Sequence, residues 1–316
     1  MTAGVILVTG AGGFIGRALC PALAARGHRV IAGLRRAPVA PAIAIAGIEP
    51  RVLGDIGPDR DWRGELRGVD AVIHLAQRAH RRAAPAGFAA EPAAAASLAR
   101  GAAQAGVRRL IYLSSIKAMG DATAGGQRLR ASDPACPADA YGRAKLATER
   151  ALEGVAAETG LAVVIVRAPL VYGPAVGGNF RLLLRLAGSG LPLPFAACDN
   201  RRSLIFRDNL VDLMTIAVQH PGAAGQVLLA ADGTDLSTAA LVRLLAEGQG
   251  RPARLFAIPG SVVAALRFLP GLGRLVAPLS LSLQVDDGAT RALLGWTPPI
   301  AAAAALTATA RAFAAT

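Results

Sequence analysis

The chain has 316 residues, enough for one large domain or for two smaller ones that each bury a sizeable core. Its 53% hydrophobic and 17% charged residues indicate a folded protein and exclude an intrinsically disordered one. The formal net charge of +13 comes almost entirely from arginine, but the arginines are scattered and aromatic residues make up only 4%. A nucleic-acid-binding protein would interleave basic clusters with stacking aromatics, so we expect no nucleic-acid partner.

The cysteines and the apolar segments exclude two further classes. Cys20, Cys136 and Cys198 lie far apart, show neither a metal-binding spacing nor a disulfide framework, and fit a reducing cytoplasm without a metal site. No uninterrupted apolar run reaches the roughly 18 residues of a membrane span. Residues 255–283 come closest, but two arginines and three prolines interrupt them. Helices of a small lobe and a contact with a membrane surface are the alternatives for this segment.

A nucleotide-binding loop follows the first predicted strand. Residues 5–8 form a continuous apolar run, typical of a strand buried on both faces of a parallel sheet. Three glycines at a spacing of three come next, and a helical pattern extends to Arg26. In this context the glycines let the backbone approach a pyrophosphate at the helix N-terminus, so we predict dinucleotide binding. The predicted cofactor contacts of this loop are Gly10, Gly13, Phe14, Ile15 and Gly16.

The end of the second predicted strand, 28–34, bears on the choice of cofactor. An NAD enzyme usually places Asp or Glu at this point to bind the ribose 2′-hydroxyl. This sequence has Arg35 and Arg36 with no acidic residue nearby, and arginines suit a 2′-phosphate. We therefore expect NADP(H) and keep NAD(H) as the alternative. A solvated basic turn without a ligand is the third interpretation.

Further strands alternate with helical segments in the first half of the chain. The pattern predicts strands at 51–56, 71–75, 110–113 and 161–166 and a helix at 91–105. This alternation predicts an α/β fold, a doubly wound parallel sheet of Rossmann type. His74 lies within an apolar run, which indicates a core histidine rather than a catalyst.

The alternation stops after Pro174. We therefore assign residues 1–173 to an NAD(P)-binding Rossmann domain and residues 174–316 mainly to a smaller C-terminal α+β lobe that binds the substrate. Segments at about 201–230 are expected to return to the Rossmann domain. The Ala-rich tail at 300–316 predicts a helix.

Tyr141 and Lys145 are the candidate catalytic pair. Four residues apart on a helix, they share one face, and Asp139 can cap that helix. A neighbouring ammonium favours the phenolate and lowers the tyrosine pKa, so the pair could hand a proton to a carbonyl oxygen. The chain has only two lysines, Lys117 and Lys145, and arginine cannot easily replace a compact charge beside a tyrosine. A chance spacing with two surface lysines is the alternative interpretation.

The predicted strand at 110–113 leads into Ser115. A serine at the carboxyl end of such a strand lies on the ligand edge of an open α/β sheet, where its hydroxyl can bind a substrate carbonyl. Residues 120–137 contain Gly, Pro and Ser and predict a mobile loop over the site. We therefore expect Ser115, Tyr141 and Lys145 to converge at one edge of the sheet.

Together these motifs resemble the extended short-chain dehydrogenase/reductases, the family that includes the NAD-dependent nucleotide-sugar epimerases and dehydratases. The resemblance covers essentially the whole chain. Its motifs are Thr9-Gly-Ala-Gly-Gly-Phe-Ile-Gly16, Gly54-Asp-Ile56, Leu113-Ser-Ser-Ile-Lys117, Tyr141-Gly-Arg-Ala-Lys145 and Arg167-Ala-Pro-Leu-Val-Tyr-Gly-Pro174. Within the family, segments such as Leu294-Gly-Trp-Thr-Pro298 are similar to UDP-N-acetylquinovosamine dehydrogenases, the 4-keto reductases of surface-polysaccharide synthesis.

The resemblance implies a role for each candidate residue. Tyr141 would be the acid/base, Lys145 would hold the nicotinamide ribose, and Ser115 would contact the sugar O4. Further cofactor contacts would come from Asp55, Ile56, Leu75, Ala76 and Pro169. The nucleotide-sugar substrate, expected to be UDP-linked, would be bound by Lys117, Asn179 and Arg202.

Two departures from the family pattern stand out. Glu91 occupies the helix position where the family usually carries an asparagine, and residues 282–286 lack a further arginine of the 4-epimerases. From the likeness to the 4-keto reductases and from the basic turn at Arg35 and Arg36, the expected function is an NAD(P)H-dependent reduction of a UDP-4-keto-6-deoxy-N-acetylhexosamine at C4. A UDP-hexose 4-epimerase with tightly bound NAD and a non-catalytic nucleotide-sugar-binding protein are the alternatives. A homodimer is left open.

Overall fold

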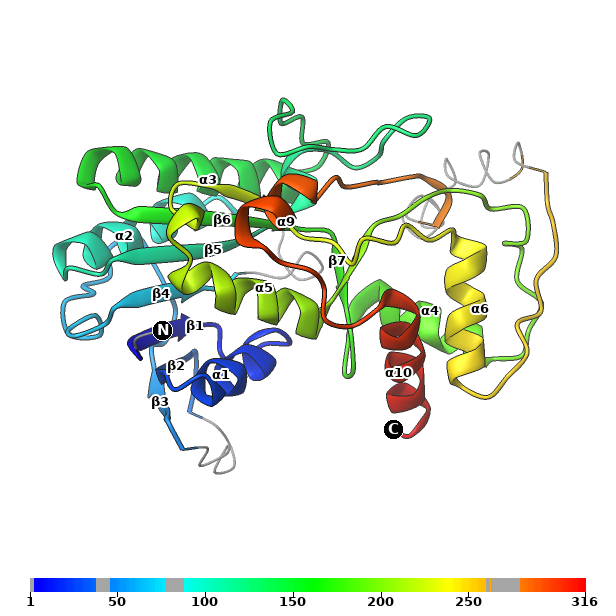
Figure 1. Cartoon of the computed structure of the whole chain (residues 1–316), viewed down its shortest axis with the longest axis horizontal. Coiled ribbons are helices and arrows are strands. Elements are labelled where there is room, and N and C mark those ends of the chain that lie inside the picture. Colours follow the sequence, from blue (N-terminus) through cyan, green and yellow to red (C-terminus); the bar gives the residue numbers. More distant parts are fainter. Residues whose placement is uncertain (1–2, 38–45, 78–87, 260–261, 263–278) are drawn as a thin grey trace.

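A seven-stranded, entirely parallel sheet organises the computed structural model, which describes residues 3–37, 46–77, 88–259, 262 and 279–316 (Figure 1). Its strands run in the order β3-β2-β1-β4-β5-β6-β9. They are β1 (Val5–Thr9), β2 (Arg29–Leu34), β3 (Ile48–Val52), β4 (Ala71–His74), β5 (Arg109–Ser115), β6 (Ala162–Ala168) and β9 (Val227–Leu229). This topology confirms the predicted doubly wound parallel sheet.

Helices cover both faces of the sheet because the strands present apolar side chains on both. Ile6 and Val8 of β1 pack on one face with α1 (Gly16–Ala25) and α5 (Arg207–Gln219). Leu7 points to the other face, which packs against α2 (Glu91–Gln104) and α3 (Ala140–Thr159). Figure 1 shows the two helix pairs on opposite sides of the strands. Burial on both faces explains why these strands read as continuous apolar runs rather than as alternating ones.

The third predicted strand was placed too late in the sequence. The prediction was 51–56, but β3 ends at Val52, so Asp55 and Ile56 follow the strand in a loop. β3 pairs only with β2 and lies at the edge of the sheet. Its sequence, Ile-Glu-Pro-Arg-Val, is only partly buried, and such an edge strand lacks the apolar run that marks the central ones.

Segments from the second half of the chain form a separate helical cluster at one end of the sheet (Figure 1). Its core joins helices that are distant in the sequence: α4 (Gly178–Gly188), α6 (Thr238–Gly248) and α10 (Ala302–Ala314). A two-stranded sheet of β7 (Leu170–Tyr172) and β8 (Leu204–Phe206) leads into this cluster. α10 confirms the predicted C-terminal helix.

The remaining elements connect the two parts. β9 pairs with β6 and so extends the seven-stranded sheet, while α9 (Gly288–Leu294) packs near it. Two short 3-10 turns cover Ile116–Ala118 and Pro221–Ala223. No helix in the described ranges is long and apolar enough to cross a membrane. Most of the 255–283 segment, for which a membrane-surface contact was an alternative, lies outside the described residues.

The direction of the strand order reverses at β1, whose neighbours are β2 on one side and β4 on the other. The chain leaves β1 and β4 in opposite directions, which opens a crevice at their carboxyl ends. Ligands of open parallel sheets bind at such a switch point. The glycine loop after β1 and the segment after β4 therefore border the expected ligand site.

Candidate active site

The glycine loop after β1 packs so tightly that two of its positions exclude a side chain. Gly10 has a φ of +73°, and a Cβ there would lie 2.8 Å from the Ala76 nitrogen. A Cβ on Gly16 would lie 2.5 Å from the Gly10 oxygen and 2.6 Å from the Ala11 Cα. These contacts bring α1 close to the ends of β1 and β4, as a dinucleotide-binding turn requires.

The N-terminus of α1 fits the pyrophosphate of a dinucleotide. Its N-cap is Ile15, whose side chain caps no backbone amide. The Arg17 and Ala18 N–H groups donate to the Gly13 and Ile15 carbonyls, and the positive end of the helix dipole attracts an anion at this turn. Ile15 packs against the core, and the Phe14 ring lies 5.4 Å from the Arg207 guanidinium. Gly13 closes the turn by donating its N–H to the Gly10 carbonyl at 2.9 Å. The residues present therefore fit the expected cofactor.

Arg35 and Arg36 are exposed just beyond β2, at the ligand edge of the sheet. Arg35 forms an ion pair with Asp55 at 2.6 Å, with about two thirds of the arginine side chain exposed. Ile56 is half-buried against the sheet core. Both arginines can thus be reached by a ligand, but Arg35 shares its charge with Asp55, a partnership that the sequence did not reveal.

The segment after β4 is held to β1 by a small hydrogen-bonded group. Leu75 N–H donates to the Thr9 carbonyl at 3.2 Å, and Ala76 N–H donates to the Thr9 hydroxyl at 3.3 Å. The same hydroxyl lies 2.8 Å from His74 Nδ1. His74 is buried, and burial lowers its pKa to about 3, so it stays neutral. This confirms His74 as a core residue that supports the nucleotide edge.

Ser115, Tyr141 and Lys145 come together where β5 meets α3. Ser115 ends β5, and its side chain hydrogen-bonds Tyr141 near the start of α3. Lys145 follows one turn later and is fully buried, with Nζ 5.3 Å from the Tyr141 ring centroid. The Phe88 and Tyr141 rings pack in an edge-to-face arrangement with their centroids 5.9 Å apart. A hydroxyl, a phenol and an ammonium therefore share one partly enclosed site.

The ionisation of this pair differs from the sequence prediction. Lys145 was expected to lower the pKa of Tyr141, but burial raises the Tyr141 pKa to about 12, opposed only by the Ser115 hydrogen bond. Burial also lowers the Lys145 pKa to about 7, against the opposing charges of Glu91 and Glu149. Both shifts have one cause: water is excluded from the site, which disfavours a charge on either group. The phenol is thus protonated at neutral pH.

Lys117 is held between two carboxylates. Its Nζ lies 2.6 Å from Asp139 and 3.1 Å from Asp121. Asp139 also caps α3 by accepting the Gly142 N–H at 2.7 Å, which confirms the predicted cap. The Lys117 side chain therefore ties the end of β5 to the helix that carries Tyr141.

The other predicted residues differ in their burial and their contacts. Arg202 donates to the Leu281 carbonyl at 3.0 Å, and burial lowers its pKa, while the charge of Asp121 opposes that change. Asn179 is exposed near the start of α4. Pro169 is buried between β6 and β7. The electrostatic contact between Arg202 and Asp121 joins the C-terminal part of the chain to the Lys117 group.

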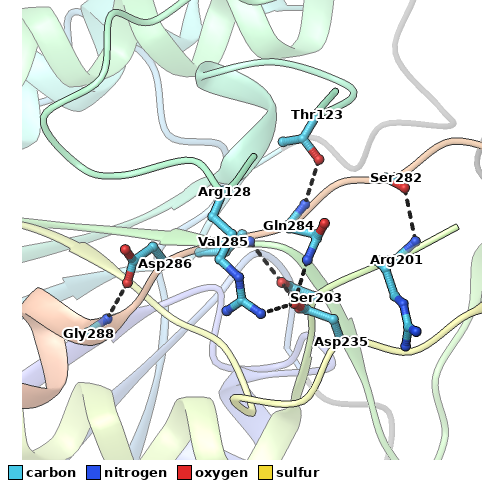
Figure 2. A network of polar contacts seen from close by, with 10 residues as sticks. All are labelled: Thr123, Arg128, Arg201, Ser203, Asp235, Ser282, Gln284, Val285, Asp286 and Gly288. Atoms are coloured by element: carbon cyan, nitrogen blue, oxygen red, sulfur yellow. Dashed lines mark hydrogen bonds and ion pairs between the residues drawn. The ribbon is translucent and has the colours of Figure 1, made fainter. Parts of the chain in front are cut away.

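The loop predicted to be mobile is anchored to the second half of the chain (Figure 2). Arg128 pairs with Asp235 at 2.6 Å, and Gln284 donates to the same carboxylate at 2.9 Å. The Gln284 N–H reaches the Thr123 hydroxyl at 3.2 Å, and Leu129 pairs with Val285 as an isolated β-bridge. Glycine and proline content alone does not reveal such long-range partners.

A buried ion pair behind the site was not predicted. Arg167 of β6 contacts Glu149 of α3 at 2.6 Å, and both side chains are less than a tenth exposed. Ser114 donates to the same carboxylate. Two signals could have indicated this group: Glu149 lies four residues after Lys145, and Arg167 interrupts a buried strand. Together with Ser114, the pair links β5, which ends at Ser115, to α3, which carries Tyr141, and to β6, which precedes Pro169.

Within the described ranges, no group of three or more His, Cys, Asp or Glu side chains is arranged to hold a metal ion.

Comparisons with known proteins agree with this geometry. The model of the NAD dependent epimerase/dehydratase family matches residues 6–230. A UDP-glucose 4-epimerase of Vibrio cholerae is 36% identical over 301 residues, covering 93% of this chain and 90% of that protein. A dTDP-6-deoxy-L-talose 4-dehydrogenase (NAD(P)(+)) of Kitasatospora kifunensis is 27% identical, again covering 93% of this chain and 90% of its own.

Solved structures support the fold. A UDP-N-acetylglucosamine 4-epimerase from Bacillus cereus matches with a TM-score of 0.79 at 20% identity and covers 98% of both chains. The glycine loop, the strand order and the Ser115, Tyr141 and Lys145 group thus accompany a family match over most of the chain. The chain therefore belongs to the NAD dependent epimerase/dehydratase family, the extended short-chain dehydrogenase/reductases, and is an NAD(P)-dependent enzyme.

Proposed function

We propose that this protein is a nucleotide-sugar enzyme that oxidises and reduces C4 of a UDP-linked hexose, acting as a 4-epimerase. The observation that carries the proposal is the convergence of Ser115, Tyr141 and Lys145 at the carboxyl edge of the sheet. The 36% identical UDP-glucose 4-epimerase, which matches along nearly the whole chain, supports this choice of reaction.

Each residue of the site has a distinct proposed task. Tyr141 exchanges a proton with the sugar O4, and Ser115 hydrogen-bonds the same oxygen and orients it. Lys145 supplies a nearby positive charge, which stabilises the phenolate that forms when Tyr141 gives up its proton. A bound nicotinamide cofactor would accept and return the hydride at C4. Exclusion of water from the site strengthens each of these electrostatic interactions.

The substrate side of the site supplies cations for the diphosphate. We propose that Arg202 is the main diphosphate contact, with Asn179 beside it and Lys117 facing the sugar. The Arg202 guanidinium donates one N–H to the Leu281 carbonyl and carries further N–H groups that can bind phosphate oxygens. Lys117 is held by Asp121 and Asp139, and its reach toward a sugar depends on releasing one of them.

Reduction of a UDP-4-keto-6-deoxy-N-acetylhexosamine is the second candidate. It is favoured by the exposed Arg35 and Arg36, which suit the 2′-phosphate of NADPH, and by the likeness to a 4-dehydrogenase. An epimerase returns the reducing equivalent to the same sugar and ends with its cofactor unchanged. A reductase uses one NAD(P)H for each product. The two reactions therefore share the same proton chemistry and differ in cofactor stoichiometry.

The Tyr141→Phe variant tests the shared chemistry. Loss of general acid–base catalysis should lower turnover by about 10²–10⁴-fold while the cofactor still binds. Tyr172→Phe is the matched control, because Tyr172 is also buried and its hydroxyl contacts Asp232, in another part of the chain. Turnover of Tyr141→Phe close to that of the wild type would refute the assignment. Normal cofactor binding with no turnover of any nucleotide sugar by the wild type would indicate a non-catalytic binding protein.

A further inference from the structure

The ammonium of Lys145 contacts a second tyrosine, Tyr112, in addition to Tyr141. Nζ lies 3.3 Å from the Tyr112 hydroxyl and 5.2 Å from the centroid of the Tyr112 ring. Both side chains are fully buried. Tyr112 comes from the middle of β5, behind the site, whereas Tyr141 lies on the same helix as Lys145. The ammonium is therefore enclosed between two tyrosine rings.

The Tyr112 hydroxyl has two side-chain hydrogen-bond partners. Lys145 donates to the Tyr112 oxygen, and a side-chain hydrogen bond joins Tyr112 to Thr148. Thr148 donates to the Ala144 carbonyl at 2.9 Å. The hydrogen bond with Thr148 lowers the pKa of Tyr112 against the larger effect of burial, and the ammonium can only donate, so the Tyr112 oxygen is the acceptor from Lys145. Burial raises the pKa of Tyr112 well above its usual value, so the Tyr112 proton is retained.

We propose that Tyr112 is a positioning residue for catalysis: its hydroxyl accepts a hydrogen bond from Lys145 and keeps the lysine charged and directed at Tyr141. The proposal rests on the proposed function for its catalytic consequence, but the geometry of Lys145 stands apart from it. A buried ammonium needs an acceptor, and a neutral hydroxyl supplies one without neutralising the charge that the Tyr141 phenolate requires.

Other charged groups also face the lysine. Glu91 acts on it from α2 and Glu149 from its own helix, and both raise the Lys145 pKa against the larger effect of burial. The Glu149 carboxylate is also engaged by Arg167 of β6. His74 of β4 stays neutral, since burial and the nearby Lys145 charge lower its pKa.

The carboxylates and Tyr112 therefore act differently on Lys145. Glu91 and Glu149 act on Lys145 through charge, whereas the Tyr112 hydroxyl lies within hydrogen-bonding distance of its nitrogen. Removing that hydroxyl while keeping the ring should consequently change the ionisation of Lys145 without removing any formal charge.

The composition of the chain makes a direct test practical. Because the protein contains only two lysines, growth with ¹³Cε-lysine gives two side-chain NMR signals, and Lys117→Met identifies the Lys117 signal. The Lys145 signal is then titrated in the wild type, in Tyr112→Phe and in the Tyr172→Phe control. We expect the Lys145 midpoint to fall by about one pH unit or more in Tyr112→Phe, since a hydrogen bond to a charged group is lost. It should not change in Tyr172→Phe.

Thr148→Val provides a second variant if Tyr112→Phe does not fold. It removes the second side-chain hydrogen bond that holds the Tyr112 hydroxyl beside Lys145, so the midpoint should fall in the same direction by a smaller amount. Superimposable Lys145 titrations in the wild type and Tyr112→Phe would overturn the proposal. If Tyr112→Phe does not fold, an unchanged midpoint in Thr148→Val would overturn it as well.

The catalytic readout separates this proposal from the proposed function. At a pH above the wild-type Lys145 midpoint, kcat of Tyr112→Phe should be lower than that of the wild type by about tenfold for each pH unit by which the midpoint drops. KM for the sugar should stay the same. An unchanged pH profile of kcat in a variant with a shifted midpoint would refute the catalytic role of Tyr112. If the wild type turns over no nucleotide sugar, the proposed function fails, and the NMR titration still decides whether Tyr112 holds Lys145.

Discussion

Replacing Lys145 with methionine is expected to stabilise the fold while it abolishes turnover. Lys145 is fully buried, and burial lowers the pKa of its ammonium from 10.5 to about 7. That drop corresponds to about 5 kcal/mol, because one pH unit is worth about 1.4 kcal/mol. Methionine keeps an unbranched apolar stem but leaves the Tyr112 oxygen without its donor, which costs about 1–3 kcal/mol. We therefore expect the free energy of unfolding to rise by about 2–4 kcal/mol at pH 7.

The shifted pKa of Lys145 also determines how the free energy of unfolding changes with pH. Between about pH 7 and 10.5, the unfolded chain holds a proton on Lys145 that the folded chain has released. Wild-type stability therefore increases with pH through this window. Below about pH 7 both states are protonated, and the full cost of burying the charge is present. The stability advantage of Lys145→Met should thus be largest below pH 7 and fall with rising pH, and by pH 10.5 the wild type should be the more stable protein, because only the lost donor to Tyr112 still counts.

Urea unfolding of both proteins at pH 6, 7, 8 and 9, without added nucleotide, measures this difference. Lys117→Met is the control, because its ammonium is paired with Asp121 and Asp139 and its loss should not stabilise the protein. A Lys145→Met variant that is less stable than the wild type at pH 6 would refute the reasoning. So would a stability difference that is independent of pH, since it would come from packing and not from charge.

Two further predictions concern the cofactor and the buried ion pair. Replacing Arg35 and Arg36 with alanine should weaken NADPH binding much more than NADH binding, as measured by fluorescence titration; equal losses would show that neither arginine contacts a 2′-phosphate. Arg167→Met should lower the free energy of unfolding by about 3–5 kcal/mol, because Glu149 is left buried without its counter-charge. The double variant Arg167→Met/Glu149→Gln should recover much of that loss in the same urea experiment, and no recovery would argue against charge burial as the cause.

The central sheet was predictable from the sequence because its strands are buried on both faces. Val5–Thr9 and Ala162–Ala168 read as apolar runs, and each lies inside the sheet with a neighbouring strand on both sides. The edge strand Ile48–Val52 was displaced in the prediction because pairing on one side leaves its polar residues in solvent. Strand positions could thus be predicted where burial on both faces requires apolar residues, but not at the exposed edge of the sheet.

The candidate catalytic residues could be proposed from spacing, but their ionisation could not. Tyr141 and Lys145 were found from their four-residue separation and from the scarcity of lysine. Their pKa shifts depend on how completely β5, α2 and α3 exclude water, which no local pattern reports. Tyr112 escaped notice for a related reason: it looks like one more apolar residue of a buried strand, and only the packed structure brings its hydroxyl to Lys145.

The long-range polar contacts were also beyond sequence reasoning. Arg128 and Asp235 are separated by more than a hundred residues, yet their ion pair helps to fasten the loop between Lys117 and Tyr141 (Figure 2). A composition rich in glycine and proline predicts an irregular loop but does not tell which distant side chains will hold it. The Arg35–Asp55 pair is a similar case, because each residue was assigned to the cofactor separately.

The most direct test of the account is the fate of a C4 label. The purified protein is incubated with UDP-[4-²H]glucose or with UDP-[4-²H]-N-acetylglucosamine, and the sugar nucleotides are separated and analysed by mass spectrometry. We expect that the C4 epimer forms, that it retains the deuterium, and that no net NAD(P)H is produced or consumed. Absence of any epimer, together with stoichiometric NADPH oxidation by a UDP-4-keto-6-deoxy-N-acetylhexosamine, would contradict the epimerase and establish the reductase instead.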